Sequence, residues 1–452
     1  MNRNIAKTKT TQTAPGTQTK RGCYYVLLFI VFSGVNMVYA DWTMELMNGQ
    51  NDRKEIKLEL PLKQIWMKKY SQISCPVLME DKLYVLDDES KYFIWGNRRL
   101  IVWEIDKKTG EKTRKHVIGE VPDIKYRRMI GYDGKIFVSV IWRDEKEWKN
   151  EKLYSYLFAY DIKNKKTIWN HTIGPIIEYG MDRENIGSWL NADDKKIFLV
   201  LMQVRKNNKL FCFDANNGNI LWKTNRPENV KIDNTYPAIG NGKVYLGTTA
   251  NQEGGKITAF DINTGSVVWE KAFSLENENM EAVDYSNMIF QEDVLYVPFQ
   301  YKINKGILMA LNASDGNKKW LFQDNDKEDS FFNYTPLIDQ KAIYACEFDD
   351  FLYKIDKKTG KLIWRFTFTT GGSHPLRFQT TKYIAYTTLG QEGYAQLIFI
   401  DKQTGQEAAR YDLPSEINRP GLRHITDVVA DNNQLFAILE DGRFYALANM
   451  GK

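Results

Sequence analysis

The chain of 452 residues is long enough for one large β domain or for two or three ordinary domains, and 13% of its residues are aromatic, which favours β-structure over helical bundles. Its formal net charge of +5 arises in the first 40 residues, which hold five basic residues and no acidic one, while the remainder holds 57 residues of each sign. A neutral body lacks the positive field that binds duplex nucleic acid, so we expect no nucleic-acid partner.

The N-terminal 40 residues have the pattern of a secretory signal. Lys20 and Arg21 precede an apolar run from Tyr24 to Ala40, and the run ends in Val-Tyr-Ala, which suits a signal peptidase. We therefore expect cleavage near Ala40 and export to the periplasm or the cell surface. The alternative is a signal-anchor that stays in the membrane as the chain's membrane contact. Because Cys23 precedes the apolar run, a lipoprotein anchor is not expected.

One ten-residue phrase recurs along the rest of the chain. Residues 260–269 read FDINTGSVVW, and relatives of this phrase occur seven times at intervals of 44 to 55 residues, with Gly four positions after the first acid or amide in six of them and Trp eight positions after it in five. Asp or Asn bonds to backbone N–H groups just ahead of it, and Gly takes the left-handed conformation of a bulged turn. Strand-like runs lie on both sides, so each repeat predicts a four-stranded antiparallel meander.

The repeat residues form three sets. The acid or amide is found at Asp106, Asp161, Asp214, Asp261, Asn312, Asp356 and Asp401. The glycine is found at Gly110, Gly218, Gly265, Gly316, Gly360 and Gly405. The tryptophan is found at Trp169, Trp222, Trp269, Trp320 and Trp364. In the second repeat Lys165 replaces the glycine, which costs about 1 kcal/mol if it adopts the left-handed conformation.

A four-stranded sheet repeated every 40 to 50 residues or so is typical of a β-propeller. After the seventh repeat, three strand-like runs remain without a fourth, and residues 62–70 form a strand that carries Trp66 without a preceding turn. Pairing these two ends completes an eighth blade and leaves no open sheet edge. We predict an all-β, monomeric, eight-bladed propeller of four-stranded antiparallel blades over residues 62–450, with a lead-in segment over residues 41–61.

The phrases YDIKNKKTIW, FDANNGNILW, FDINTGSVVW and KIDKKTGKLIW resemble the repeats of pyrroloquinoline-quinone (PQQ)-type eight-bladed propellers. The resemblance covers about residues 41–449 and extends to the BamB-like proteins and the quinoprotein alcohol dehydrogenases. It implies that the turn glycine and the tryptophan lock neighbouring blades together, with the indole against the next blade's turn. The dehydrogenases of the family have adjacent cysteines and a calcium site. This chain has no adjacent cysteines, so we expect neither PQQ nor calcium as a cofactor.

Other groups that could carry chemistry are scattered along the chain. Acidic residues at 87–89 and 349–350 are interpreted as turn residues. No metal-ligand spacing relates the four histidines, which are His116, His171, His374 and His424. We therefore predict no catalytic, cofactor-binding or metal-binding residue.

Two predicted loops, over residues 87–100 and 142–155, are longer than a blade requires. Both mix tryptophan and arginine with charged residues, a composition enriched at interface hot spots, and residues 419–427 lead into the last blade. The candidate partner-binding residues are Trp95, Trp142, Trp148, Arg419 and Arg423. The alternative for the three tryptophans is packing against their own blades.

These observations predict an exported, non-catalytic scaffold with a protein partner in the cell envelope, similar to BamB in outer-membrane protein assembly. Two alternatives remain open. One is a PQQ- and calcium-dependent quinoprotein dehydrogenase. The other is a cell-surface propeller that binds carbohydrate or another polymer, because aromatic side chains in the funnel stack on sugar rings.

Overall fold

The structure is a computed structural model. It describes residues 56–70, 73–79, 81–89, 98–121, 123–143, 153–177, 188–201, 209–225, 230–231, 237–250, 254–275, 278–282, 288–301, 305–324, 332, 335–346, 351–368, 375–389, 394–414 and 424–449. The predicted signal segment lies outside these residues. So do four of the candidate partner-binding residues, namely Trp95, Trp148, Arg419 and Arg423.

Seven blades follow one another in chain order, and the strands of each are antiparallel. Blade 1 consists of β2 (Ile73–Met79), β3 (Lys82–Glu89), β4 (Arg98–Ile105) and β5 (Lys112–Val121). Blade 2 consists of β6 (Asp123–Tyr132), β7 (Lys135–Arg143), β8 (Leu153–Asp161) and β9 (Lys166–Ile177). Blade 3 consists of β10 (Ser188–Asp193), β11 (Lys196–Leu201), β12 (Lys209–Asp214) and β13 (Ile220–Asn225).

The inner strand is divided in the next two blades. Blade 4 consists of β14 (Val230–Lys231), β15 (Ala238–Gly240), β16 (Lys243–Ala250), β17 (Gly254–Asp261) and β18 (Val267–Ala272). Blade 5 consists of β19 (Ser274–Leu275), β20 (Glu278–Ala282), β21 (Ile289–Gln291), β22 (Val294–Tyr301), β23 (Lys305–Asn312) and β24 (Lys318–Phe322). Blade 6 consists of β25 (Leu337–Ile338), β26 (Ala342–Cys346), β27 (Phe351–Asp356) and β28 (Leu362–Thr367). Blade 7 consists of β29 (Leu376–Gln379), β30 (Tyr383–Leu389), β31 (Ala395–Asp401) and β32 (Glu407–Leu413).

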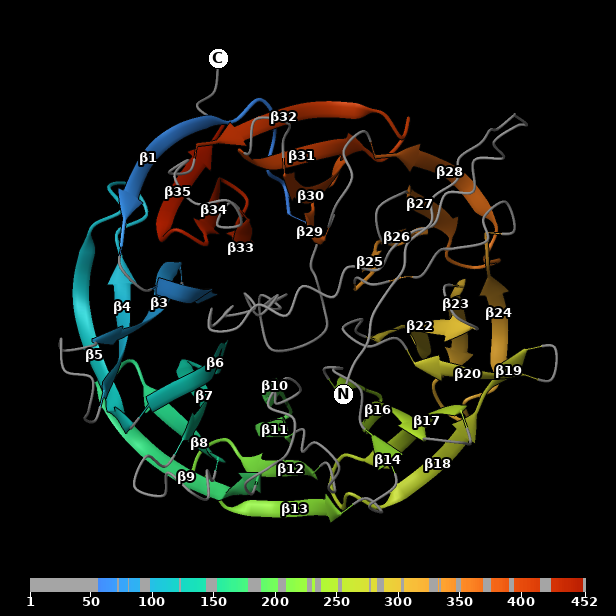
Figure 1. Ribbon diagram of the computed structural model, residues 1–452, viewed down its shortest axis with the longest axis horizontal. Helices are drawn as coiled ribbons and strands as arrows, with labels where there is room; N and C mark the ends of the chain where they lie inside the picture. Colours follow the sequence, from blue (N-terminus) through green and yellow to red (C-terminus); the bar gives the residue numbers. More distant parts are fainter. Residues whose placement is uncertain are drawn as a thin grey trace, which may run out of the picture. The chain divides into compact units, whose positions relative to one another are not determined.

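Blade 8 joins the two ends of the described chain, as predicted. Its inner strands are β33 (Ile425–Ala430), β34 (Gln434–Leu439) and β35 (Arg443–Ala448), and its outer strand is β1 (Lys63–Lys69). Strand β1 pairs antiparallel with β35, with Trp66 opposite Ala446. Strand β33 contacts β29 on one side and β2 on the other, which closes the ring that Figure 1 shows. The eight-bladed, all-β fold is therefore confirmed.

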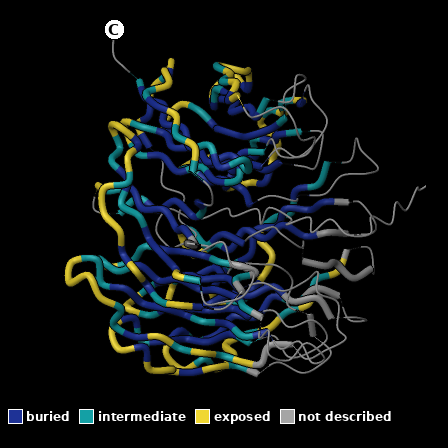
Figure 2. Tube along the Cα trace, turned by 60° about the vertical axis from the view of Figure 1, so that its left-hand side comes forward, coloured by how far each residue is buried: buried dark blue, intermediate teal, exposed yellow. Residues whose placement is uncertain are grey.

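Burial follows the position of a strand within its blade. The middle strands are buried along their length, as β26 is, because neighbouring blades cover both of their faces. The outer strands β18 and β28 alternate between exposed and half-buried residues. Figure 2 shows buried residues along the strands and exposed residues at many of the turns. No helix among the described residues could cross a membrane.

Both predicted long loops are shorter than expected, because the strands on either side extend further into them. Strand β3 continues through Glu89 and β4 begins at Arg98, while β7 continues through Arg143 and β8 begins at Leu153. Asp87, which was expected in a turn, is instead a buried strand residue opposite Ile101. It is tolerated there because its carboxylate accepts hydrogen bonds from Lys112 Nζ (2.7 Å) and Trp103 Nε1 (3.2 Å). The centres of both loops lie outside the described residues.

The repeated turn has the geometry that its residues require. Asp261 Oδ1 accepts hydrogen bonds from the N–H groups of Asn263 (3.0 Å) and Thr264 (2.8 Å), and the N–H of Gly265 donates to the Asp261 carbonyl oxygen (2.9 Å). Gly265 has a φ of +69°, in the left-handed region that suits glycine. In blade 2 Lys165 takes this conformation with a φ of +55°.

Lys165→Gly is expected to raise the free energy of unfolding by about 0.5–1 kcal/mol, because glycine removes the left-handed strain but adds freedom to the unfolded chain. Urea unfolding followed by circular dichroism measures the change. Lys163→Gly in the same turn is the control and should lower stability, since Lys163 is not among the residues with positive φ. Equal losses from both substitutions would contradict the prediction.

Candidate functional site

Neighbouring blades meet where a tryptophan of one blade touches the turn of the next. Trp222 in blade 3 donates a hydrogen bond from Nε1 to the carbonyl oxygen of Ile262 in blade 4, at 3.0 Å. Its ring lies against Gly265, so close that a Cβ atom added there would come within 2.6 Å of indole carbons. The glycine is therefore required both by its φ and by the ring packed against it.

Six junctions are built in this way. In each, the indole Nε1 donates to the carbonyl of the residue after the anchor acid or amide, at 2.9 to 3.2 Å. The donors and acceptors are Trp66 and Lys107, Trp169 and Ala215, Trp222 and Ile262, Trp269 and Ala313, Trp320 and Lys357, and Trp364 and Lys402. We call this contact the indole lock. Among the described residues, two junctions lack this indole hydrogen bond, namely the junction of blade 7 with blade 8 and that of blade 1 with blade 2.

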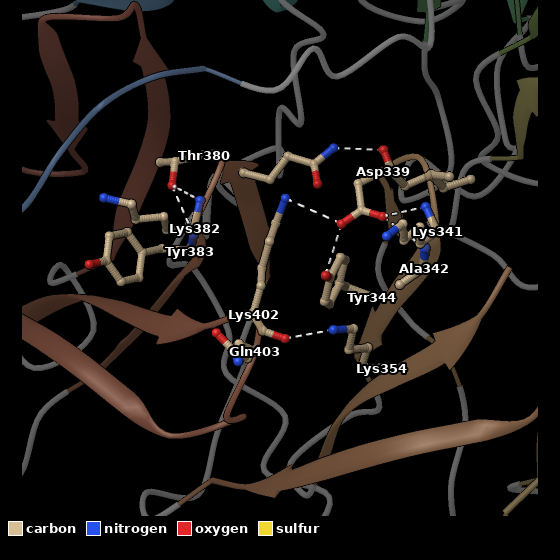
Figure 3. Close-up of polar contacts among 12 residues, drawn as sticks. Asp339, Lys341, Ala342, Tyr344, Lys354, Thr380, Lys382, Tyr383, Lys402 and Gln403 are labelled. Atoms are coloured by element: carbon tan, nitrogen blue, oxygen red, sulfur yellow. Dashed lines mark hydrogen bonds and ion pairs between the residues drawn. The ribbon is translucent and has the colours of Figure 1, made fainter.

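The lock between blades 6 and 7 is reinforced by charged groups (Figure 3). The Lys402 carbonyl accepts from Trp364 Nε1 at 3.1 Å and also from Lys354 Nζ at 2.7 Å. The Lys402 ammonium group is buried and lies 3.4 Å from Asp339 Oδ2 in blade 6, which also accepts from the Tyr344 hydroxyl at 2.9 Å. Burial lowers the pKa of Lys354. This charged cluster lies in a junction that the indole already fills, so it serves as a structural crosslink.

Asp339 is expected to make stability depend on pH. Burial alone would raise the pKa of Asp339, but two main-chain N–H bonds, the charge of Lys402 and the Tyr344 hydroxyl hold that pKa below its ordinary value. Its stabilisation is therefore complete above about pH 4 and is lost as pH falls through the folded-state pKa. Asp339→Asn should lower the free energy of unfolding at pH 7 by about 2–3 kcal/mol, because it removes the carboxylate that pairs with the buried ammonium group of Lys402.

Urea unfolding of both proteins between pH 7 and pH 3 tests this prediction, and the difference between them should shrink below about pH 4. Asp81→Asn is the control, since Asp81 pairs with Lys107 but its side chain is 94% exposed. A difference that stays constant over the whole pH range would contradict the assignment.

The junction between blades 7 and 8 is filled by the N-terminal lead-in. Ala409 holds the position of the tryptophan, opposite Phe399, and cannot fill the gap. Ile56 and Leu58 of the lead-in, together with Leu62 just after it, are instead buried in one cluster with residues of both blades. The N–H of Leu62 donates to the Tyr411 hydroxyl at 2.7 Å. The last residues of the lead-in are therefore part of the propeller core, a role that its sequence did not indicate.

The junction between blades 1 and 2 has neither an indole nor a lead-in. Arg114 holds the position of the tryptophan, opposite Glu104, and Lys165 holds the position of the facing glycine. A pocket of about 330 Å³ opens at this place. Its lining includes the basic residues Lys82, Arg114, Lys135, Lys163 and Lys165 and the acidic residues Asp133 and Asp161.

Part of this positive charge is paired within the protein. Lys82 Nζ lies 3.1 Å from Glu104, and Lys135 Nζ lies 3.0 Å from Asp133. The guanidinium of Arg114 is 3.9 Å from Glu104 and half exposed. Lys163 and Lys165 are exposed and form no ion pair with another described residue. The lining of the pocket therefore carries excess positive charge, which suits an anionic ligand.

Of the five candidate partner-binding residues, Trp142 is the one that the structure describes, and it lies near the end of β7. Its ring stacks on Tyr154 and Tyr156 of β8, with centroids 4.9 and 5.4 Å away, so it packs against its own blade.

No group of histidine, cysteine, aspartate or glutamate in the described residues could hold a metal ion. His116 is buried beside the Tyr160 hydroxyl, and burial lowers its pKa. The residues described here thus supply no ligand set for a metal.

The fold and its junctions define the class of this protein, the PQQ-type eight-bladed propellers. A family model described as outer membrane protein assembly factor BamB matches residues 154–351 and 349–451. Because the matches cover more than half of the chain, the chain belongs to this family of BamB-like propellers. No curated protein matches it.

Several solved structures have a similar fold. The computationally designed Ika8 protein is 12% identical with a TM-score of 0.55, and the match covers 88% of this chain and 100% of Ika8. The quinohemoprotein alcohol dehydrogenase from Comamonas testosteroni is 15% identical with a TM-score of 0.50, over 68% of this chain and 63% of the enzyme. BamB from Moraxella catarrhalis is 15% identical with a TM-score of 0.38, over 68% of this chain and 98% of BamB. The two matches with TM-scores of 0.50 and 0.55 show the fold, and identity at this level does not decide the activity.

Proposed function

We propose that the protein is an exported β-propeller that binds a partner protein in the cell envelope and acts as a scaffold. The observation that carries the proposal is the open junction between blades 1 and 2, a basic pocket in a fold that otherwise fills its junctions. Membership of the BamB-like family and the secretory pattern of residues 1–40 support the location. A specific role in outer-membrane protein assembly is the form of this function that the family suggests.

The residues described do not suit a quinone cofactor of the kind that the dehydrogenases use. The cysteines Cys75, Cys212 and Cys346 are buried in three different blades, so no pair can form beside a cofactor. Burial raises the pKa of the Cys212 thiol to about 12, which makes it an inert core residue. We therefore derive no redox step for this chain.

Crosslinking in the native host, followed by identification of the crosslinked proteins, tests the scaffold proposal. We expect a defined envelope protein to be recovered with the propeller and to bind the purified protein in vitro. Recovery of no specific partner would contradict a scaffold.

A second assay addresses the enzyme. Purified protein supplied with PQQ and calcium should show no change in visible absorbance and no dye-linked oxidation of alcohols. Turnover in this assay would favour the quinoprotein alternative. Binding of cell-surface polysaccharide, without a protein partner, would favour the carbohydrate alternative.

A further inference from the structure

We infer that the pocket between blades 1 and 2 binds a tryptophan side chain carried on an acidic segment of the partner protein. The partner would thereby supply the indole lock that this junction lacks. The inference rests on the proposed scaffold function and specifies the chemistry of its partner. It follows from the equivalence of this junction with the locked ones, from the charge of the pocket and from its size.

The backbone acceptor of the lock is present in blade 2. Ile162 follows the anchor Asp161 as Ile262 follows Asp261, and the N–H of each isoleucine donates to a turn glycine, Gly134 or Gly242. In blade 4 the Ile262 carbonyl accepts the indole N–H of Trp222. The Ile162 carbonyl accepts no hydrogen bond from the described part of the chain. An acceptor that is used at six junctions is therefore available at this one.

The aromatic support of the lock is also present. In blade 4 Tyr245 pairs with Ala259, which pairs with Trp269, and the two rings lie 6.0 Å apart. In blade 1 Tyr84 holds the same register, pairing with Glu104, which pairs with Arg114. Tyr84 is fully buried and lines the pocket. This junction thus retains Tyr84, the ring that corresponds to the one packed beside the indole in other blades, but Arg114 stands at the tryptophan position of the outer strand.

The charge of the pocket selects the residues next to that indole. Arg114 is half exposed, and Lys163 and Lys165 are exposed without an ion pair among the described residues, so three cations stand at the entrance. Carboxylates beside a tryptophan would pair with them, and a guanidinium or ammonium group is attracted to the face of an indole. An acidic segment that carries tryptophan satisfies both, whereas a basic segment would be repelled.

The volume of the pocket sets the size of the occupant. At about 330 Å³ it is at the lower end of the range of ligand sites, which suits one large side chain and its immediate neighbours. Buried tryptophans that fill a pocket are also among the side chains that contribute most to protein interfaces. The pocket therefore fits a single anchor residue of a partner better than an extended polymer.

Filling the slot from within the protein tests the inference. Arg114→Trp combined with Lys165→Gly restores the two residues of the lock, and Glu104 keeps its ion pair with Lys82. The probe is a fluorescein-labelled peptide Glu-Asp-Trp-Asp-Glu, with Glu-Asp-Ala-Asp-Glu and Gln-Asn-Trp-Asn-Gln as controls. Fluorescence anisotropy should show binding of the first peptide to the wild type, and more than about tenfold weaker binding of both controls and of the filled variant.

A second variant keeps the inference testable if the first variant fails to fold. Lys163→Glu changes one exposed residue of the turn and should weaken binding about tenfold while circular dichroism and the unfolding midpoint stay unchanged. Unchanged affinity in both variants, or equal affinity for the alanine peptide, would overturn the inference. If a crosslinked partner is recovered equally with the wild type and the filled variant, the scaffold function stands and this binding mode fails.

Discussion

Replacing Trp222 by alanine is expected to lower the free energy of unfolding by about 3–5 kcal/mol, the usual cost of removing a large buried aromatic side chain. The indole is 8% exposed, and its loss removes both the packing on Gly265 and the hydrogen bond to Ile262. Because the ring joins two blades, the loss should also make those blades unfold less cooperatively.

Leu221→Ala is the matched control, since Leu221 precedes Trp222 on the same strand but is 46% exposed. It should change stability by no more than about 0.5–1 kcal/mol. Urea unfolding followed by tryptophan fluorescence and circular dichroism compares the two variants. Similar losses from both would show that the junction is not held by the indole.

Gly265→Ala is expected to destabilise the protein by about 2–4 kcal/mol, through left-handed strain and through a clash with the Trp222 ring. A Cβ atom there would lie 2.6 Å from indole carbons, whereas Gly242 in the neighbouring turn has a φ of +67° and no atom within 4 Å of such a Cβ. Gly242→Ala therefore isolates the strain, and should cost only about 1–2 kcal/mol.

The difference between the two glycine variants measures the indole contact alone. Calorimetric and urea unfolding of both proteins should show the larger loss for Gly265→Ala. Equal losses would mean that these glycines are needed for their φ and not for the lock.

The architecture could be predicted because each repeat residue has a local task. An acid that caps a turn, a glycine with positive φ and a tryptophan eight positions on from the acid can be recognised without knowledge of their partners. The displaced Trp66 likewise indicated how the ring closes. Such patterns depend on neighbours in the chain, and the fold that they predict was confirmed.

The site was harder to predict because it depends on contacts between distant residues. The sequence identified Lys165 as a strained turn residue. The structure shows in addition that Lys165 lines the same pocket as Arg114 of the preceding blade. At this junction both members of the lock, Arg114 and Lys165, differ from the repeat, and this difference can be found in the sequence once the tryptophan of each repeat is compared with the glycine of the next. The pairing of Asp339 with Lys402 and the burial of Leu58 follow no local pattern.

The predicted loops illustrate a different limit. Residues 87–89 are rich in acidic groups and were expected to turn, but the strand continues, and Lys112 on the outer strand β5 reaches past β4 to pair with Asp87. A prediction from polarity alone therefore ended strand β3 before residue 87, whereas the strand continues through Glu89. Of the aromatic residues in the predicted loops, Trp142 stacks on its own blade, and this left the junction between blades 1 and 2 as the better candidate for binding.

The most direct test of the account is site-specific crosslinking from that junction in the native host. A photo-reactive residue in place of Asn164, an exposed neighbour of Lys163 in the same turn, should capture one envelope protein, and the crosslink should map to an acidic segment next to a tryptophan. The product should disappear when Arg114→Trp and Lys165→Gly are added to the same protein. Capture of the same product by the filled propeller, or a crosslink that maps to a segment without tryptophan, would contradict the account.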